Sequence, residues 1–511
     1  MRHRIDPLRR SGSASPVAGA DPPPAAVRLR SPAGRWIVFA CILGSGLAGI
    51  DSTVVNVALP AIGRSLHVGF SDLQWTVTAY SVTLAALILL GGSLGDRFGR
   101  RRVFTIGVVA FSAASVLCAV APGIWFLLIA RAIQGAGAAL LTPASLAILE
   151  ATFAAGDRGP AIGRWSSLSG TASAIAPFVG GWLLAAGDWR WVFLINPPLG
   201  VLVALIAWRH IPETRAPNSN GRIDVVASLL CVAGLGGLTA GIIALADRPP
   251  TATAVWAPLV AGTVALCGFL TYEHRAASPM LPLGLFRIRQ FSAANAVTFL
   301  LYAANGGALL LLVIELQTVS GLSPLRAGSG LLPITIVMIL LASRFGALAQ
   351  HAGPRWFMAG GPLVSATGLA LLTRLTPASS YWRDVLPALT VFALGLAIFV
   401  APLTATALGT APPDQAGIAS GVNNAVARAA GLIAIAALPV LVGLTGDDYN
   451  SAGAYLGPFR TAMWICAALH LAAGVLAAAT VRNPHHTTAG ATCVPACSVA
   501  LSGELVAQSA R

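Results

Sequence analysis

The chain has 511 residues, of which 56% are hydrophobic and only 10% are charged, and its mean hydropathy is +0.77. A soluble domain carries about 25% charged residues, so this composition excludes a soluble globular protein. Apolar runs long enough to cross a bilayer recur along the chain, which is typical of an all-α polytopic membrane protein. The net charge is +14, and every Lys or Arg position is an arginine.

Residues 1–35 are rich in arginine, proline, serine and alanine. This composition cannot bury an apolar core, so we expect a disordered cytoplasmic tail. The Arg9-Arg10 pair is not followed directly by an apolar region, and we therefore expect an uncleaved first helix rather than a signal peptide.

The apolar runs predict fourteen membrane-spanning helices, at about residues 36–59, 73–93, 103–121, 124–149, 160–186, 190–208, 224–245, 253–272, 291–316, 328–349, 355–373, 385–408, 416–443 and 460–481. They divide into a six-helix bundle in 36–209, two inserted helices in 223–273 and a second six-helix bundle in 291–481, followed by a tail at 482–511.

The arginine distribution predicts the orientation of these spans. An even number of spans places both termini on one side, and the segments on that side hold 23 of the 32 arginines, against seven in the opposite loops. Arginine excess marks the cytoplasmic side, so we expect a cell-membrane protein with both termini in the cytoplasm. The excess of arginine on the cytoplasmic side explains the net charge of +14, so no nucleic-acid partner is expected.

A short motif recurs after a shift of 254 residues. The first copy consists of Gly92, Leu94, Asp96, Arg97, Gly99, Arg100 and Arg101, and the second of Gly346, Leu348, Gln350, His351, Gly353, Pro354 and Arg355. Two related halves around a central site are a transporter architecture. Chance similarity between glycine-rich loops is the alternative. The charged first copy is either a positively charged anchor or a cytoplasmic latch that binds its partners in one conformation only.

Asp51 lies inside the first apolar run, which begins at Trp36. An acid there costs about 2.5–3.5 kcal/mol or more, so Asp51 is a candidate functional residue unless the helix ends before it. From the helical rise, Asp51 lies roughly 21 Å above the inner end of its span and Arg131 roughly 9 Å below the outer end of the fourth. These depths are similar, so the two side chains either compensate each other or face different partners. A direct pair would change state when the acid takes a proton.

Four more polar residues lie within the spans. Asn305 occupies the repeat position of Asp51, and Arg428 lies near the midplane, where we expect it to face a cavity rather than lipid. His470 is interpreted either as a buried core histidine or as a proton carrier. Glu315 lies near the outer end of its span, either solvated or facing substrate. The seven cysteines form no disulfide or zinc pattern, so no metal is expected.

Several motifs in residues 36–481 resemble the fourteen-helix drug:proton antiporters (QacA/EmrB-like) of the major facilitator superfamily. They are Asp51 to Pro60, Gly92 to Arg101, Arg131-x-x-Gln134-Gly135-x-Gly137, Trp189 to Pro198, and Pro282-Leu283-x-Leu285-Phe286. The antiporter motif is kept at Pro177, Gly180 and Gly181, whereas Ala176 stands where that family usually has glycine. This departure weakens the inference of antiport more than that of fold.

The resemblance implies a proton-coupled efflux transporter of amphipathic drugs or an antibiotic-like metabolite. It implies proton coupling through Asp51 and Arg131, with a substrate cavity between the halves at Asn305, Glu315, Arg428 and His470. We expect a monomer that uses the proton gradient and no cofactor. Proton-coupled uptake or exchange of a small nutrient on the same scaffold is the alternative. An enzyme is disfavoured, because no nucleotide-binding loop, zinc cluster or soluble domain is visible in the sequence.

Overall fold

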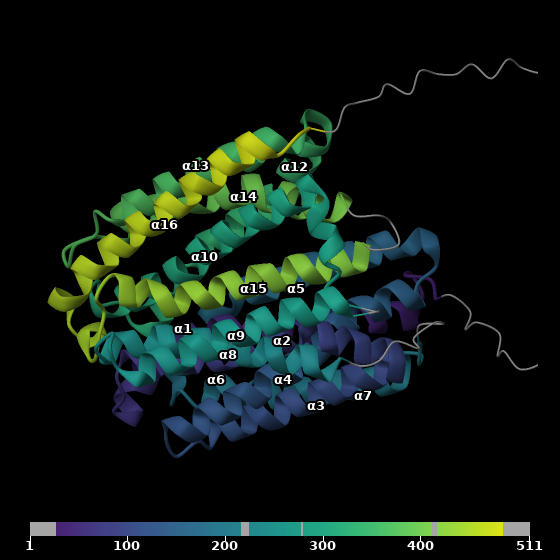
Figure 1. Cartoon of the computed structure of the whole chain (residues 1–511), viewed down its shortest axis with the longest axis horizontal. Coiled ribbons are helices and arrows are strands. Elements are labelled where there is room, and N and C mark those ends of the chain that lie inside the picture. The colour runs from purple at the N-terminus through teal and green to yellow at the C-terminus, as the bar shows by residue number, and fades with distance from the viewer. Residues whose placement is uncertain (1–26, 216–223, 277–278, 411–415, 484–511) are drawn as a thin grey trace, which may run out of the picture.

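The computed structural model describes residues 27–215, 224–276, 279–410 and 416–483 (Figure 1). The regular secondary structure of these residues is helical, apart from one isolated bridge between Val27 and Phe153. The tail predictions for 1–26 and 484–511 lie outside the described residues. The all-helical fold predicted from the apolar runs is confirmed for the described part of the chain.

The N-terminal half comprises α1 (Pro32–Leu66), α2 (Phe70–Phe98), α3 (Arg100–Ala119), α4 (Ile124–Thr152), α5 (Ala155–Ala186), α6 (Trp191–Leu194) and α7 (Asn196–His210). Helix α1 begins before Trp36, because the Ser31 side chain accepts a hydrogen bond from the Gly34 amide at 3.1 Å. The predicted sixth span corresponds to Trp191–His210, in which Ile195 separates α6 from α7 just before Pro197 and Pro198.

The C-terminal half comprises η1 (Leu283–Arg287), α10 (Arg289–Thr318), α11 (Pro324–Ser329), α12 (Leu332–Ala352), α13 (Pro354–Leu372), η2 (Tyr381–Val385), α14 (Leu386–Gly409), α15 (Ala416–Leu441), η4 (Asp448–Asn450) and α16 (Ala452–Thr480). Helices α8 (Val225–Asp247) and α9 (Thr253–Arg275) lie between the halves in sequence. They pack against each other, and α8 also contacts α2 and α15.

The two halves repeat one packing scheme. In the first, α4 packs on α2 and α3, and α1 on α5 and α7; in the second, α14 packs on α12 and α13, and α10 on α15 and α16. The repeated loops also correspond. Gly99 and Gly353 both have positive φ, +112° and +86°, a region that favours glycine. Beside them, Glu213 accepts a hydrogen bond from the Arg101 amide at 3.1 Å, and Asn483 accepts one from the Arg355 amide at 3.0 Å.

Twelve of the described helices are long and apolar enough to cross a membrane, and they include α8 and α9. Helices α5 and α13 occupy the positions of the other two predicted spans. Part of α5 falls outside the residues whose side chains are described, and only its Ile175–Ala186 segment registers as apolar. The count of fourteen spans therefore stays a prediction.

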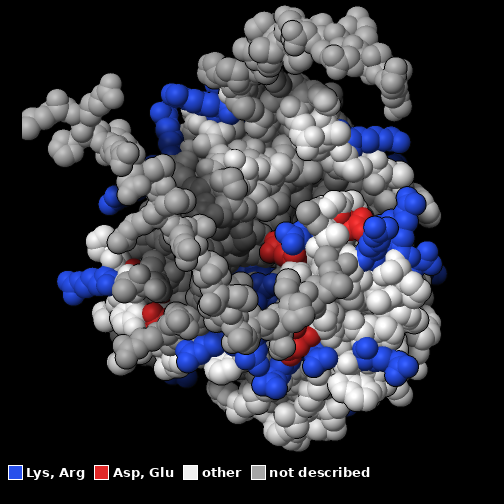
Figure 2. All heavy atoms as spheres, turned by 90° about the vertical axis from the view of Figure 1, so that its right-hand side faces the viewer, with Lys and Arg blue, Asp and Glu red and all other residues white. Residues whose placement is uncertain are grey.

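The halves meet closely at the end opposite the start of α1 and the end of α16. There Gln317 donates to the Val57 carbonyl at 3.0 Å, and the Tyr449 hydroxyl donates to the Val68 carbonyl at 3.0 Å. The start of α1 and the end of α16 both lie toward the other end, on the right of Figure 1. Figure 2 shows that this second face is hollowed near its centre and carries many arginine side chains. The structure is therefore closed at one end and open at the arginine-rich end.

Candidate functional site

Asp51 and Arg131 form a fully buried ion pair between α1 and α4. The Arg131 Nη1 donates to the Asp51 Oδ2, and the two residues are 0% and 1% exposed. The similar depths estimated from the sequence thus correspond to direct contact. A buried acid beside a buried arginine keeps the local charge balanced, which each residue alone would not do.

Two neutral side chains complete the surroundings of the carboxylate. Gln134 Nε2 donates to the Asp51 Oδ1 at 2.8 Å, and Asn196 Nδ2 donates to the same oxygen at 3.1 Å. Both amides are 0% exposed. Together with Arg131, they give the carboxylate three hydrogen-bond donors, which is the arrangement that suits its deprotonated form.

The network extends to two further helices. Ser115 on α3 accepts hydrogen bonds from Gln134 at 2.7 Å and Asn196 at 3.2 Å. On α2, the Thr76 carbonyl accepts from the Arg131 Nε at 3.0 Å, and the Tyr80 ring lies 4.4 Å from the guanidinium carbon. The Asp51 carboxylate is thereby connected to side chains or backbone of four other helices.

A glycine beside Gln134 permits the close approach of α4 to α2. A methyl group added at Gly135 would lie 2.1 Å from the Thr83 Oγ1 and 2.3 Å from the Tyr80 carbonyl oxygen. Small residues let membrane helices pack this closely. The glycine after Gln134 in the sequence motif therefore positions the arginine of α4 against Tyr80.

Gln134, Asn196, Ser115 and Tyr80 are not among the site residues predicted from the sequence. Gln134 lies three residues after Arg131, so the two share a face of α4, and this spacing is a signal that could have found it. Asn196 is the first residue of α7 and precedes Pro197 and Pro198. Ser115 and Tyr80 carry no comparable sequence signal.

The predicted cavity residues fall into two pairs. Asn305 on α10 and Arg428 on α15 are partly exposed, and each has one enclosed polar atom, Oδ1 and Nε, without a hydrogen-bond partner. Glu315 and His470 are 0% exposed. The expectation that these last two line an open cavity does not fit this conformation, because both lie inside the packed C-terminal half.

The surroundings of the two buried residues explain their placement. The His470 Nδ1 donates a hydrogen bond to the Cys466 carbonyl at 3.0 Å, and the His470 ring contacts the rings of Phe392 and Phe399. Glu315 accepts a hydrogen bond from Ser320 at 3.0 Å through Oε1, while its Oε2 has no hydrogen-bond partner. Asp51 is thus held by three donors, whereas Glu315 has one.

Arg100 and Arg101 of the predicted latch loop contact other residues of the N-terminal half. Arg100 donates to the Asp96 Oδ1 at 2.9 Å through Nε and at 2.7 Å through Nη2, and its Nη1 donates to the Ala147 carbonyl at 3.2 Å. The Arg101 Nη1 donates to the Ile211 carbonyl at 3.2 Å. The loop therefore ties α2 and α3 to α4 and to the end of α7 in this conformation.

The antiporter-motif segment of α5 touches the other half directly. A methyl group at Gly181 would lie 2.4 Å from the Pro324 carbonyl oxygen, and one at Gly328 would lie 2.0 Å from the Pro177 carbonyl oxygen. Gly180 faces α1, where a methyl group would lie 3.0 Å from a Val54 methyl. Backbone contact between α5 and α11 thus forms part of the closed end.

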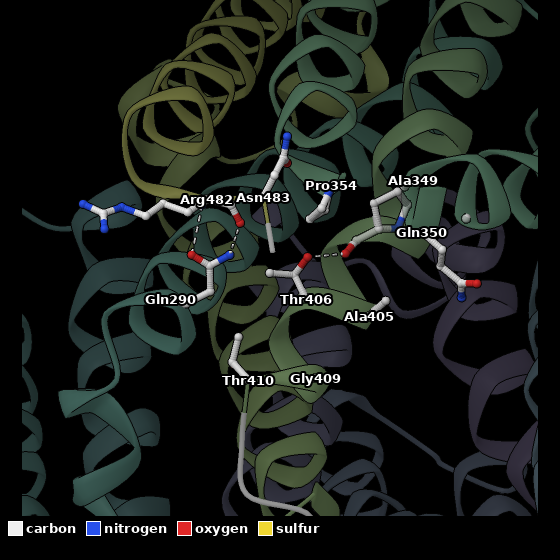
Figure 3. A pocket seen from close by; sticks show the side chains of 12 residues that line it. Gln290, Ala349, Gln350, Pro354, Ala405, Thr406, Gly409, Thr410, Arg482 and Asn483 are labelled. Atoms are coloured by element: carbon white, nitrogen blue, oxygen red, sulfur yellow. Dashed lines mark hydrogen bonds between the residues drawn. The ribbon is translucent and has the colours of Figure 1, made fainter. Parts of the chain in front are cut away.

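A cavity of about 500 Å³ lies in the C-terminal half at the arginine-rich end (Figure 3). It is bordered by α10, α12 and α14. In Figure 3 the Gln290 side chain turns toward Arg482, whose carbonyl accepts from the Gln290 Nε2 at 3.0 Å and whose amide donates to the Gln290 Oε1 at 3.1 Å. None of the residues that line this cavity belongs to the Asp51 network.

The chain has two helical halves of equivalent packing, which are closed at one end and open at the other, and one half holds a buried ion pair. This architecture is that of secondary transporters. Residues 41–436 match the model of the Major Facilitator Superfamily, and the chain belongs to this family. It is a membrane transporter and not an enzyme.

Named relatives and solved structures agree with this assignment. The chain is 35% identical to the puromycin resistance protein of Streptomyces alboniger over 79% of this chain and 81% of that protein. It is 31% identical to the tetracenomycin C resistance and export protein of Streptomyces glaucescens, over 79% and 75%. A crystal structure of the peptide transporter POT has the same fold, with a TM-score of 0.63 at 15% identity, over 88% of this chain and 98% of that one.

Proposed function

We propose that this protein is a proton-coupled efflux transporter that exports amphipathic small molecules, either drugs or an antibiotic-like metabolite. The observation that carries the proposal is the buried Asp51–Arg131 pair with its amide donors. Two of the chain's relatives are named for antibiotic resistance, one of them also for export, which supports the direction of transport.

The proposed cycle begins from the conformation described above, in which Asp51 is enclosed and held by donors. Opening of the opposite end lets a proton reach the carboxylate. Protonation removes its charge and leaves Arg131 with neutral acceptors, the Gln134 Oε1 at 2.6 Å and the Thr76 carbonyl. Because a buried arginine without its acid is costly, the protonated network favours rearrangement of α1 against α4. Release of the proton on the other side restores the pair.

Further features belong to the same proposal. Asn305 and Arg428 border the substrate cavity, and Glu315 and His470 would join it only after their helices move. The latch formed by Gly92, Asp96, Arg97, Gly99, Arg100 and Arg101 stabilises one conformation, and α5 forms the gate at the closed end. We propose fourteen spans with both termini in the cytoplasm of the cell membrane, and a monomer that needs no cofactor beyond the proton gradient.

Transport in proteoliposomes tests the role of Asp51. Removing one partner of a buried ion pair costs about 3–5 kcal/mol, so Asp51→Asn is compared with the double variant Asp51→Asn/Arg131→Gln, which removes both charges. We expect both variants to lose pH-gradient-driven transport of rhodamine 6G while keeping gradient-free exchange of this dye. Asp188→Asn, at an exposed ion pair with Arg190, is the control. Full gradient-driven transport by a folded double variant would contradict the proton role.

The direction of the driven flux separates export from the alternative of nutrient uptake. Everted membrane vesicles from expressing cells should accumulate the dye when their interior is acidified, because their lumen corresponds to the outside of the cell. Accumulation by right-side-out vesicles under an inward proton gradient would instead support uptake.

A further inference from the structure

Arg428 lies at the level of two tyrosines between the halves. On α10, a methyl group added at Gly306 would lie 3.0 Å from the Cα of Gly431, so Tyr302 and Arg428, about one turn earlier on each helix, share a level. On α2, Gln74 donates to the Ile435 carbonyl at 2.8 Å. Since α2 and α15 run in opposite directions, Tyr80 lies near the level of Arg428.

Arg428 differs from Arg131 in its partners. Arg131 has an acid, an amide oxygen and a carbonyl as acceptors and is 0% exposed. Arg428 is partly exposed, its enclosed Nε has no hydrogen-bond partner, and it forms no ion pair within the described part of the chain. The titratable side chains that interact with it electrostatically are Tyr80 and Tyr302, both uncharged phenols.

An arginine within a membrane span is expensive unless an anion or a set of acceptors compensates it. The acceptors of Arg131 come from the protein itself, whereas Arg428 lacks an acid partner in the described residues. A guanidinium is also a planar donor that binds carboxylates in a bidentate manner. An acidic group on a molecule bound between the two halves beside Arg428 would therefore supply the compensation that the chain does not.

The exposed tyrosine beside Arg428 adds a contact of a second kind. Tyr302 is 36% exposed although it lies within a membrane-spanning helix at mid-depth. Tyr302 on α10 and Tyr80 on α2 both lie near the level of Arg428 and interact with it electrostatically. Aromatic rings of this kind bind flat apolar skeletons and present a polar hydroxyl at one end.

We propose that Arg428 binds the acidic group, a carboxylate or ionised phenol, of a transported aromatic molecule whose ring system packs on Tyr302. This inference rests on the proposed export function and names aromatic organic anions as one class of its substrates. The anion occupies the site in the conformation open at the arginine-rich end.

Equilibrium binding tests the inference independently of transport. The probes are fluorescein, an anionic xanthene dye, and rhodamine 6G, a cationic ester of the same ring system. Their binding to protein in nanodiscs is followed by fluorescence anisotropy. A hydrogen bond to a charged group is worth about 1.5–3 kcal/mol, so Arg428→Gln should weaken fluorescein binding by about tenfold to a hundredfold. Arg428→Lys should lose less, and rhodamine 6G binding should stay unchanged or improve.

Arg374→Gln removes the same charge from an exposed loop position and is the matched control. The inference is overturned if wild-type protein fails to bind fluorescein, if Arg428→Gln binds it as tightly as wild type, or if both dyes are weakened equally. The last result would indicate a structural role for Arg428. If wild-type protein binds fluorescein but shows no proton-driven export, the result counts against the proposed function alone, because the binding assay needs no gradient.

Discussion

The substitution Gln134→Leu probes the centre of the Asp51 network without changing its charge. The Gln134 Nε2 donates to Asp51 and Ser115, and its Oε1 accepts from Arg131 at 2.6 Å. Leucine has a similar size but neither donor nor acceptor. The variant therefore removes the bridge between the two members of the ion pair and leaves their direct contact in place.

The expected loss follows from the bonds that disappear. Two of them join Gln134 to charged partners, and such bonds contribute about 1.5–3 kcal/mol each, which sets an upper range of about 3–6 kcal/mol. Asp51 keeps Arg131 and Asn196, and Arg131 keeps the Thr76 carbonyl. We therefore expect the lower end of that range, about 3 kcal/mol.

Thermal denaturation in detergent, followed by intrinsic fluorescence at one scan rate, measures the effect. Gln290→Leu is the control, because Gln290 also makes two hydrogen bonds, but to the neutral backbone of Arg482 near the surface. Neutral bonds contribute about 0.5–1.5 kcal/mol each at most, so this variant should melt closer to wild type. Equal midpoints for both variants would refute the reasoning, since the bridge would then add nothing beyond ordinary hydrogen bonds.

Two further variants test the closed end and the second buried acid. Gly181→Ala should slow transport, because its methyl group would lie 2.4 Å from the Pro324 carbonyl oxygen. Gly123→Ala is the control, because its methyl group would meet nothing within 4 Å. Equal transport rates of the two variants in proteoliposomes would contradict the proposed gate at α5. Glu315→Gln should melt no lower than wild type, because the amide keeps an acceptor for Ser320 and no described cation pairs with the acid. A large fall in its midpoint would show that an ionised carboxylate is required at this position.

The fold could be predicted largely from apolar runs and one repeated motif. The shift that relates Gly99 to Gly353 in sequence also relates them in backbone conformation, because both loops need the same positive φ. The break at Ile195 was not predicted. A hydropathy pattern does not register it, since the segment stays apolar on both sides of Pro197 and Pro198, which lack the backbone N–H groups of a regular helix.

The candidate site was only partly predictable for a physical reason. Charged residues within a span are costly, so Asp51 and Arg131 stand out in the sequence, and helical rise gives their depth. Neutral amides such as Gln134 and Asn196 carry a much smaller cost. Which face of each helix they share depends on how the helices pack, and this information lies in contacts between distant segments.

The two intramembrane arginines together bear on the energetics of the proposed cycle. Tyr80 lies against Arg131 and interacts electrostatically with Arg428, so the proton site and the proposed anion site are adjacent but distinct. Export of one singly charged anion in exchange for one entering proton is electrically equivalent to moving two positive elementary charges into the cell. Each charge gains about 2.3 kcal/mol per 100 mV of membrane potential. An anion bound at Arg428 would therefore be driven outward by the potential as well as by the proton gradient, whereas a monovalent cation exchanged for a proton would be driven by the gradient alone.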